Sequence, residues 1–336
     1  MEKSYDALLL VSFGAPESID QVEPFLNRIT EGKNIPPDRL KEIAERYKTI
    51  GGISPLNSNI RNLKKLLEIE LANRDINTPI FIGHRNAEPL IEKTINDMNE
   101  MGISNCLTWL ASPYSSYSSC RQYTENIEDA CSKIGANAPY MEQIRRHHDH
   151  PGLIEPAAEN LRAALEKLPS NKKTALLFSA HSLPVSMADN CRYEAEIRES
   201  SSLIAGLVDP ENKLPKEIVW QSRSGPPSVP WLEPDINDKI KELASEGIEA
   251  VAVSPVGFPV ENFEILWDLD HEASDEANNC GMSFSRADTV HNDPRFISMI
   301  GDLLCERINK PIHAKAGLGA FSSQLDKCEE GCCPNG

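Results

Sequence analysis

The sequence predicts an α/β protein made of two Rossmann-like domains, each with a parallel sheet. Short buried apolar runs alternate with amphipathic segments of 10–15 residues, and the alternation occurs in both halves of the chain. With 336 residues, the chain is long enough for two ordinary domains. We expect an N-terminal α/β domain over residues 1–150, a C-terminal α/β domain over 151–312, a tail over 313–336, and a ligand cleft between the domains.

The first half contains three expected strands and four expected helices. The strands are apolar runs bounded by Gly, Pro or Asn, whereas the helices show a 3.6-residue apolar period. The strands are Ala7–Phe13, Pro79–Gly83 and Cys106–Ala111, and the helices are Asp38–Thr49, Asn59–Leu71, Glu88–Glu100 and Tyr123–Ile134.

The second half repeats this pattern with the same signals. Its expected strands are Thr174–Ala180, Ile218–Gln221 and Ala250–Val256. Its expected helices are Pro156–Leu168, Tyr193–Leu207, Asp235–Glu246, an acidic helix after residue 260, and Pro294–Asn309. The two halves could therefore be structural copies of each other.

The charge of the chain excludes several classes of partner. A formal charge of −17 argues against non-specific binding to nucleic acid or to an anionic membrane surface. No apolar run approaches the roughly 20 residues that span a bilayer, and the N-terminal residues do not resemble a secretory signal. We expect a cytoplasmic protein without a stable membrane anchor.

Several ligand-binding and catalytic motifs are absent from the sequence. No G-x-G-x-x-G follows a strand, and there is no P-loop, G-x-S-x-G or H-E-x-x-H motif. Three histidines, His147, His148 and His150, crowd one segment. They could bind a metal, but a surface loop is the interpretation that we favour.

Two segments concentrate residues with catalytic chemistry. Thr174–Pro184 is a buried run that reaches His181, and the acidic helix carries Glu261, Glu264, Asp268 and Glu272 at spacings of three, four and four. At about 100° per residue, the four carboxylates would share one helix face. Such a face is often solvated surface, but apolar residues surround it here and it follows a strand, where α/β proteins bind ligands. A cation site or cation path is the alternative.

The nine cysteines suggest a metal site at the end of the chain. Most lie in apolar or helical patterns typical of core thiols, but Cys328, Cys332 and Cys333 cluster in the last nine residues. The sequence alone leaves three possibilities for them, namely incidental thiols, a zinc site or an iron–sulfur cluster.

The chain resembles ferrochelatases, which insert ferrous iron into a porphyrin. Four motifs carry the resemblance in order: YKTIGGISPL (47–56), SAHSLP (179–184), WQSRSGPPSVPWLEPD (220–235) and PVGFPVENFEILWD (255–268). Together they extend the resemblance over nearly the whole chain.

The resemblance implies a role for each candidate residue. By this resemblance, His181 matches the catalytic histidine and Glu264 matches the carboxylate that faces it. Asp268 and Glu272 match acidic positions that conduct protons or metal. All four are candidate metal-contacting residues. Where some relatives carry a second histidine, this chain has Asn262.

The resemblance also implies porphyrin contacts. These are Phe13 in the turn Ser12–Pro16, Arg46, Ser54 and Tyr123. Several bacterial relatives have Tyr in place of Phe13, so ligation of product iron by a tyrosinate is not expected here. Arg and hydroxyl groups suit the propionate carboxylates of a porphyrin.

A [2Fe–2S] cluster is the cofactor that the resemblance implies. Its ligands would be Cys120, Cys328, Cys332 and Cys333, with Fe²⁺ as a substrate. The segment Tyr114–Tyr123 resembles relatives that use coproporphyrin III, so we favour that porphyrin over protoporphyrin IX. A non-catalytic haem carrier or iron–sulfur sensor is a further alternative, and a transient partner that receives the product is plausible.

Overall fold

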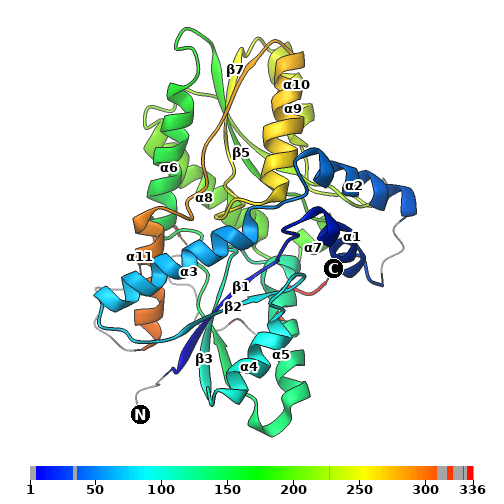
Figure 1. Ribbon diagram of the computed structural model, residues 1–336. Helices are drawn as coiled ribbons and strands as arrows, with labels where there is room; N and C mark the ends of the chain where they lie inside the picture. Colours follow the sequence, from blue (N-terminus) through cyan, green and yellow to red (C-terminus); the bar gives the residue numbers. More distant parts are fainter. Residues whose placement is uncertain are drawn as a thin grey trace. The chain divides into compact units, whose positions relative to one another are not determined.

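The computed structural model describes residues 5–32, 36–226, 228–308, 316–320, 328 and 331–335. The chain forms two compact units that interleave along the sequence (Figure 1). The first unit contains residues 1–111, 123–143 and 260–263, and the second contains residues 112–122, 144–259 and 264–336. The predicted division into 1–150, 151–312 and 313–336 stays a prediction.

The first unit contains a four-stranded parallel sheet in the order β2-β1-β3-β4. Its strands are β1 (Ala7–Ser12), β2 (Ile80–His84), β3 (Asn105–Leu110) and β4 (Tyr140–Gln143). The helices are α1 (Ile19–Ile29), α2 (Pro37–Thr49), α3 (Leu56–Asn73), α4 (Ile91–Glu100) and α5 (Gln122–Ile134). Every residue of β1 is buried, as expected for a central strand with both faces covered.

The second unit has the same strand order, β6-β5-β7-β8, and all its pairs are parallel. Its strands are β5 (Thr174–His181), β6 (Lys216–Gln221), β7 (Ala250–Ser254) and β8 (Ser283–Arg286). Its helical segments are Tyr117–Arg121, α6 (Pro151–Glu166), α7 (Val185–Ala188), α8 (Tyr193–Val208), α9 (Ile236–Ser245), Ile265–Ala273, α10 (Ser274–Asn279) and α11 (Pro294–Arg307). The shared order supports the view that the two halves are structural copies.

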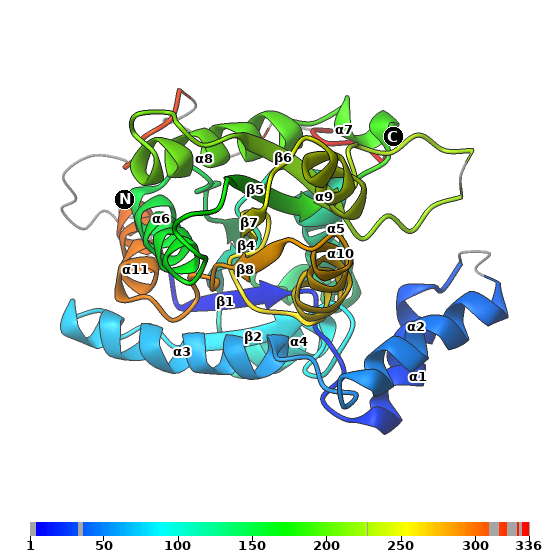
Figure 2. The same cartoon turned by 90° about the horizontal axis from the view of Figure 1, so that it is seen from above.

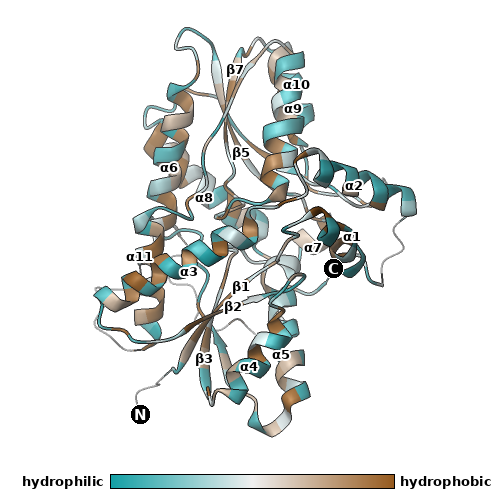
Figure 3. Ribbon diagram, in the orientation of Figure 1, coloured by the Kyte–Doolittle hydropathy of each residue, from teal (hydrophilic) through white to brown (hydrophobic). Residues whose placement is uncertain are grey.

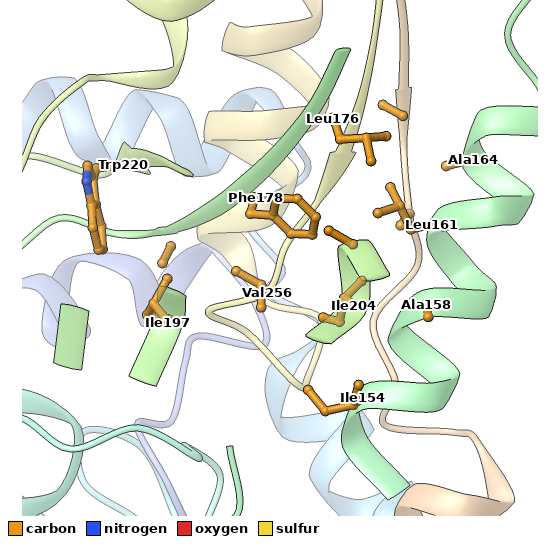
Figure 4. Close-up of a cluster of buried hydrophobic side chains, with 14 of the residues drawn as sticks. Ile154, Ala158, Leu161, Ala164, Leu176, Phe178, Ile197, Ile204, Trp220 and Val256 are labelled. Carbon is orange, nitrogen blue, oxygen red and sulfur yellow. The ribbon is translucent and has the colours of Figure 1, made fainter. Parts of the chain in front are cut away.

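The core of the second unit lies on both faces of its sheet. On one face, side chains of α6, including Leu161 and Ala164, point towards Leu176 and Phe178 of β5 (Figure 4). On the other face, apolar residues of α9 and of the segment 265–273 cover alternate residues of β5 and β7. The central strands β1, β5 and β7 consist mainly of apolar residues, while the helices carry both apolar and polar residues (Figure 3). This packing fixes the carboxyl ends of β5, β6 and β7.

The α/β fold with two parallel sheets is confirmed, and three local predictions were wrong. The four-residue strands β4 and β8 were missed because YMEQ and SFSR are short and largely polar, as edge strands can be. The helix α1 was missed because Pro24 interrupts its pattern. The acidic segment Ile265–Ala273, which we expected to be α-helical, is π-helical, and a second π-helical turn, Tyr117–Arg121, precedes the expected helix that begins at Tyr123. None of the helices in the described part of the chain combines the length and the apolar character needed to span a membrane.

Candidate active site

The carboxyl ends of β5 and β6 place polar side chains next to each other. His181 ends β5, Gln221 ends β6, and the two residues are paired in the register of the sheet. The strand order changes direction between β5 and β7, which is where open α/β sheets bind ligands. Gly257, after β7, approaches so closely that a Cβ atom there would lie 2.7 Å from the backbone of Ala180. A side chain at 257 would therefore displace the turn beside His181.

His181 presents one ring nitrogen to a carboxylate. Its Nδ1 lies 2.5 Å from the carbonyl oxygen of Ser182, and since only an N–H can bond to a carbonyl, Nδ1 carries a proton. In the neutral ring, Nε2 then holds a lone pair. This atom lies 3.7 Å from Oε1 of Glu264, and both side chains are partly exposed, at 32% and 41%. The pair can accept and pass on protons from a bound molecule.

Asp268 is an electrostatic neighbour of this pair and belongs to a network of hydrogen bonds. Ser222 donates to Oδ2 of Asp268, and Gln221 Nε2 lies 3.3 Å from the same oxygen. Burial, followed by the neighbouring Glu264 carboxylate, raises the pKa of Asp268 to about 7, although the bond from Ser222 opposes the shift. A carboxyl group with a pKa near neutrality is suited to proton transfer.

Ser222 adopts a strained backbone conformation to reach Asp268. Its φ angle is +63°, in the left-handed region that residues other than glycine rarely occupy. Gln221 is fixed as well, because Ser179 Oγ donates to its Oε1 at 2.5 Å. Gln221 and Ser222 both belong to the motif WQSRSGPPSVPWLEPD, but no role was predicted for either of them. Backbone strain of the kind found at Ser222 is concentrated at functional sites.

The prediction of four carboxylates on one α-helical face was wrong. Glu261 lies before the helical segment, where its carbonyl oxygen accepts from Asn59, and Ile265–Ala273 has π-helical rather than α-helical bonding. Glu272 accepts a hydrogen bond from Trp267 Nε1 at 2.7 Å. Glu264, Asp268 and Glu272 are still electrostatic neighbours, because Glu264 and Glu272 both raise the pKa of Asp268. Asp268 is therefore the carboxylate that both of the others influence electrostatically.

The first unit brings two of the predicted porphyrin-binding residues together around a residue that was not predicted. The guanidinium carbon of Arg85 lies 5.7 Å from the ring centroid of Phe13 and 5.9 Å from that of Tyr123. Phe13 is 38% exposed, whereas Tyr123 is buried. Arg85 directly follows the end of β2, so its place after a strand could have indicated a functional residue from the sequence.

Two other predicted porphyrin contacts, Arg46 and Ser54, already make contacts within the first unit. Arg46 Nη2 lies 3.0 Å from Oε1 of Glu42 on the same helix, α2. Ser54 is buried, and its backbone N–H donates to the carbonyl of Pro16 at 3.0 Å. The roles predicted for both residues stay predictions.

The second unit contains two thiol contacts among the predicted cluster ligands. The Cys333 thiol donates a hydrogen bond to Cys120, which lowers the pKa of Cys120 to about 6 although burial opposes the shift. Cys328 contacts Cys332 in a second hydrogen bond, and burial raises the pKa of Cys328 to about 11. The positive charge of Arg146 opposes this rise and contributes to the lowered pKa of Cys120. A fifth thiol, Cys191, is an electrostatic neighbour of Cys120 and Cys333. It was not predicted.

Within the described ranges, no three or more His, Cys, Asp or Glu side chains are arranged to hold a metal ion. The prediction that His147, His148 and His150 form a surface loop was wrong, because all three are buried. Burial lowers the pKa of His150 to about 4, so this ring is neutral at physiological pH.

Comparison with known proteins decides the family. A family model described as Ferrochelatase matches residues 5–308. The chain belongs to the ferrochelatase family. Among curated ferrochelatases, it is 41% identical to coproporphyrin III ferrochelatase of Nocardia farcinica over 345 residues, which cover 98% of this chain and 96% of the relative. It is also 41% identical to a ferrochelatase of Rhodopirellula baltica (98% and 93% covered), and 42% identical to coproporphyrin III ferrochelatase of Mycolicibacterium vanbaalenii (90% and 90% covered).

A chelatase structure shares the fold of this ferrochelatase family member. SirB from Bacillus subtilis with Fe³⁺ aligns with a TM-score of 0.51 at 11% identity, covering 91% of this chain and 95% of SirB. At this identity, the similarity shows the fold alone.

Proposed function

We propose that this protein inserts Fe²⁺ into coproporphyrin III as a step of haem biosynthesis. The geometric observation that carries the proposal is the lone pair of His181 Nε2 facing Glu264 at the carboxyl end of β5. Relatives that are 37–42% identical and named coproporphyrin III ferrochelatase support the reaction and the substrate.

The reaction requires groups that accept protons. A free-base porphyrin loses two N–H protons as Fe²⁺ binds its four nitrogens, so the products are the iron porphyrin and two H⁺. We assign to His181 the role of accepting a proton at Nε2, with Glu264 next to it as the following acceptor. Asp268, whose pKa is raised to about 7, can exchange a proton with this pair, and Glu272 is a further carboxylate in its electrostatic surroundings.

Protoporphyrin IX is the second candidate substrate. It carries two propionates, whereas coproporphyrin III carries four. The Rhodopirellula relative is named ferrochelatase without a stated porphyrin, so family membership alone does not select the substrate. The coproporphyrin names among the other relatives favour the four-propionate molecule.

Anaerobic loss of porphyrin fluorescence on addition of Fe²⁺ tests the proposed activity. We expect many turnovers per protein molecule with coproporphyrin III. Stoichiometric quenching that stops after one equivalent would instead indicate a haem carrier or an iron–sulfur sensor. No change with either porphyrin would contradict the proposed function.

We propose that Arg85 binds a propionate of the porphyrin. Its guanidinium lies close to two aromatic rings, and Arg pairs with carboxylates through charge-assisted hydrogen bonds. Arg85→Met should raise the KM for porphyrin by about tenfold, the loss expected for one such bond, with a smaller change in kcat. The matched control is Arg74→Met, since Arg74, directly after α3, pairs with Glu70 at 2.7 Å. An unchanged KM would remove Arg85 from the binding site.

We also propose that Cys120, Cys328, Cys332 and Cys333 bind a [2Fe–2S] cluster. The observation that supports this proposal is that the four cysteines make two pairwise thiol contacts within one unit, and a [2Fe–2S] cluster takes four sulfur ligands. Cys120 lies in a π-helical turn close to Arg146, whose positive charge favours thiolates. When bound, the cluster would supply redox or structural chemistry, whereas these residues hold it in place.

Replacing Cys120 by serine tests the ligand set. We expect the purified variant to lose the visible absorption of the cluster and most of its bound iron. Cys280→Ser is the control, because the thiol of Cys280 contacts Glu276 at the end of α10. If absorption persists in Cys120→Ser but disappears in a Cys120→Ser/Cys191→Ser double variant, Cys191 is the substitute ligand. Persistence in both variants would exclude Cys120 from the set.

A further inference from the structure

A short segment of the tail, residues 316–320, lies in a polar site of the second unit. We propose that Arg145, Asp149 and Glu199 form a docking site for this segment, which holds the tail in place without any metal. The docking itself does not depend on the iron–sulfur cluster or on the iron-insertion activity proposed above.

Four hydrogen bonds join the segment to the docking site. Arg145 Nη2 donates to the carbonyl of Ala316 at 2.9 Å. In the opposite direction, three consecutive backbone N–H groups of the tail donate. Leu318 N–H donates to the carbonyl oxygen of Asp149 at 3.0 Å, and Gly319 N–H donates to Oδ2 of Asp149 at 3.3 Å. Ala320 N–H donates to Oε1 of Glu199 at 2.6 Å. Both ends of the segment are thus bound through their main chain.

The docking residues are held in place by partners other than the tail. Arg145 forms two bonds with the carboxylate of Glu306, at 2.7 and 2.8 Å, and both side chains of this ion pair are almost fully buried. Glu199 Oε2 lies 2.8 Å from His148 Nε2, and the His148 carbonyl accepts from Ser200 Oγ. A site fixed in this way binds with a small entropic cost.

The tail also fits the site sterically at Gly319. A Cβ atom at this position would lie 2.3 Å from Cδ and from Oε2 of Glu199. The Glu199 carboxylate is held by His148 and by the Ala320 N–H, so it cannot move aside without losing one of these bonds. A side chain at 319 should therefore displace the segment.

Docking at 316–320 has a consequence for the terminal cysteines. The described residues 331–335 lie beside α7 in both views (Figures 1 and 2), and the Cys333 thiol hydrogen-bonds to Cys120. A tail anchored at 316–320 shortens the free chain that carries Cys333, which lowers the entropic cost of its contact with Cys120 before iron arrives. Assembly of a cluster, if one forms, would then fill a site whose thiols are already gathered.

Hydrogen exchange of the metal-free, full-length chain tests the docking site. The protein is prepared under iron chelation, and exchange is followed by mass spectrometry in a peptide containing Leu318–Ala320. We expect protected amides in the wild type and exchange at least about tenfold faster in both Glu199→Ala and Gly319→Val. Glu194→Ala is the control, since Glu194 is on the same helix but pairs with Arg198.

A second readout reports on the thiols. Alkylation of Cys333 by iodoacetamide should be faster in Glu199→Ala and Gly319→Val than in the wild type and Glu194→Ala. Gly319→Val leaves Arg145, Asp149 and Glu199 unchanged, so its effect cannot come from unfolding of the docking site itself. The proposal is overturned if these amides exchange at free-peptide rates in the metal-free wild type, or if both variants keep wild-type protection. Protection that appears only after iron loading would also overturn it, because the cluster would then be holding the tail.

Discussion

His181→Ala is expected to lower the rate of iron insertion by about 10²–10⁴-fold, the usual contribution of a general base. The reason is the position of Nε2, which has a lone pair when Nδ1 is bonded to the Ser182 carbonyl and which faces Glu264. The loss should appear mainly in kcat, because the imidazole acts on the pyrrole protons rather than on the propionates.

The fold should survive this substitution. His181 is partly exposed at the end of β5, and its backbone carbonyl still accepts from Tyr193 Oη in the variant. Anaerobic initial rates with Fe²⁺ and far-UV circular dichroism measure the two effects separately. His271→Ala is the control, because His271 is an exposed imidazole that stacks on Trp267. A folded His181→Ala variant with nearly full activity would contradict the assigned role.

Asp268→Asn is expected to make the protein more stable at high pH, by on the order of a few kcal/mol relative to wild type. The native pKa of Asp268 is raised from 3.8 to about 7 by burial and by Glu264. Between these values the native state binds more protons than the unfolded state. The stability that Asp268 contributes is therefore fully present below about pH 4 and is lost as the pH rises to about 7.

Asparagine cannot ionise but can still accept the bonds from Ser222 and Gln221. Urea unfolding of both proteins at pH 5 and pH 8 should show a difference in unfolding free energy that grows with pH. The control is Asp238→Asn, since Asp238 is exposed on α9. A difference that stays constant between the two pH values would mean that Asp268 ionises normally in the folded protein.

Much of the fold could be predicted from the sequence, because its central strands have strong local signals. Runs such as ALLLVSF and AVAVS are apolar on both faces, which is typical of strands covered by helices on both sides. The edge strands β4 and β8 lack this signal, since one side has no neighbouring strand and their residues are largely polar.

Residues that end a strand were the part of the candidate site with the plainest local signal. His181 was found in this way, and Arg85 could have been found after β2 by the same reasoning. The π-helical bonding of Ile265–Ala273 could not be predicted, because the spacing of its carboxylates also fits an α-helix. Nor could the left-handed conformation of Ser222 be predicted, since no glycine marks it.

A competition between two porphyrins tests the central claim most directly. Equal concentrations of coproporphyrin III and protoporphyrin IX are mixed anaerobically with limiting Fe²⁺, and the ratio of the two iron porphyrins gives the ratio of kcat/KM values. We predict that iron coproporphyrin III predominates. Predominance of iron protoporphyrin IX would contradict the proposed substrate, and absence of both products would contradict the proposed reaction.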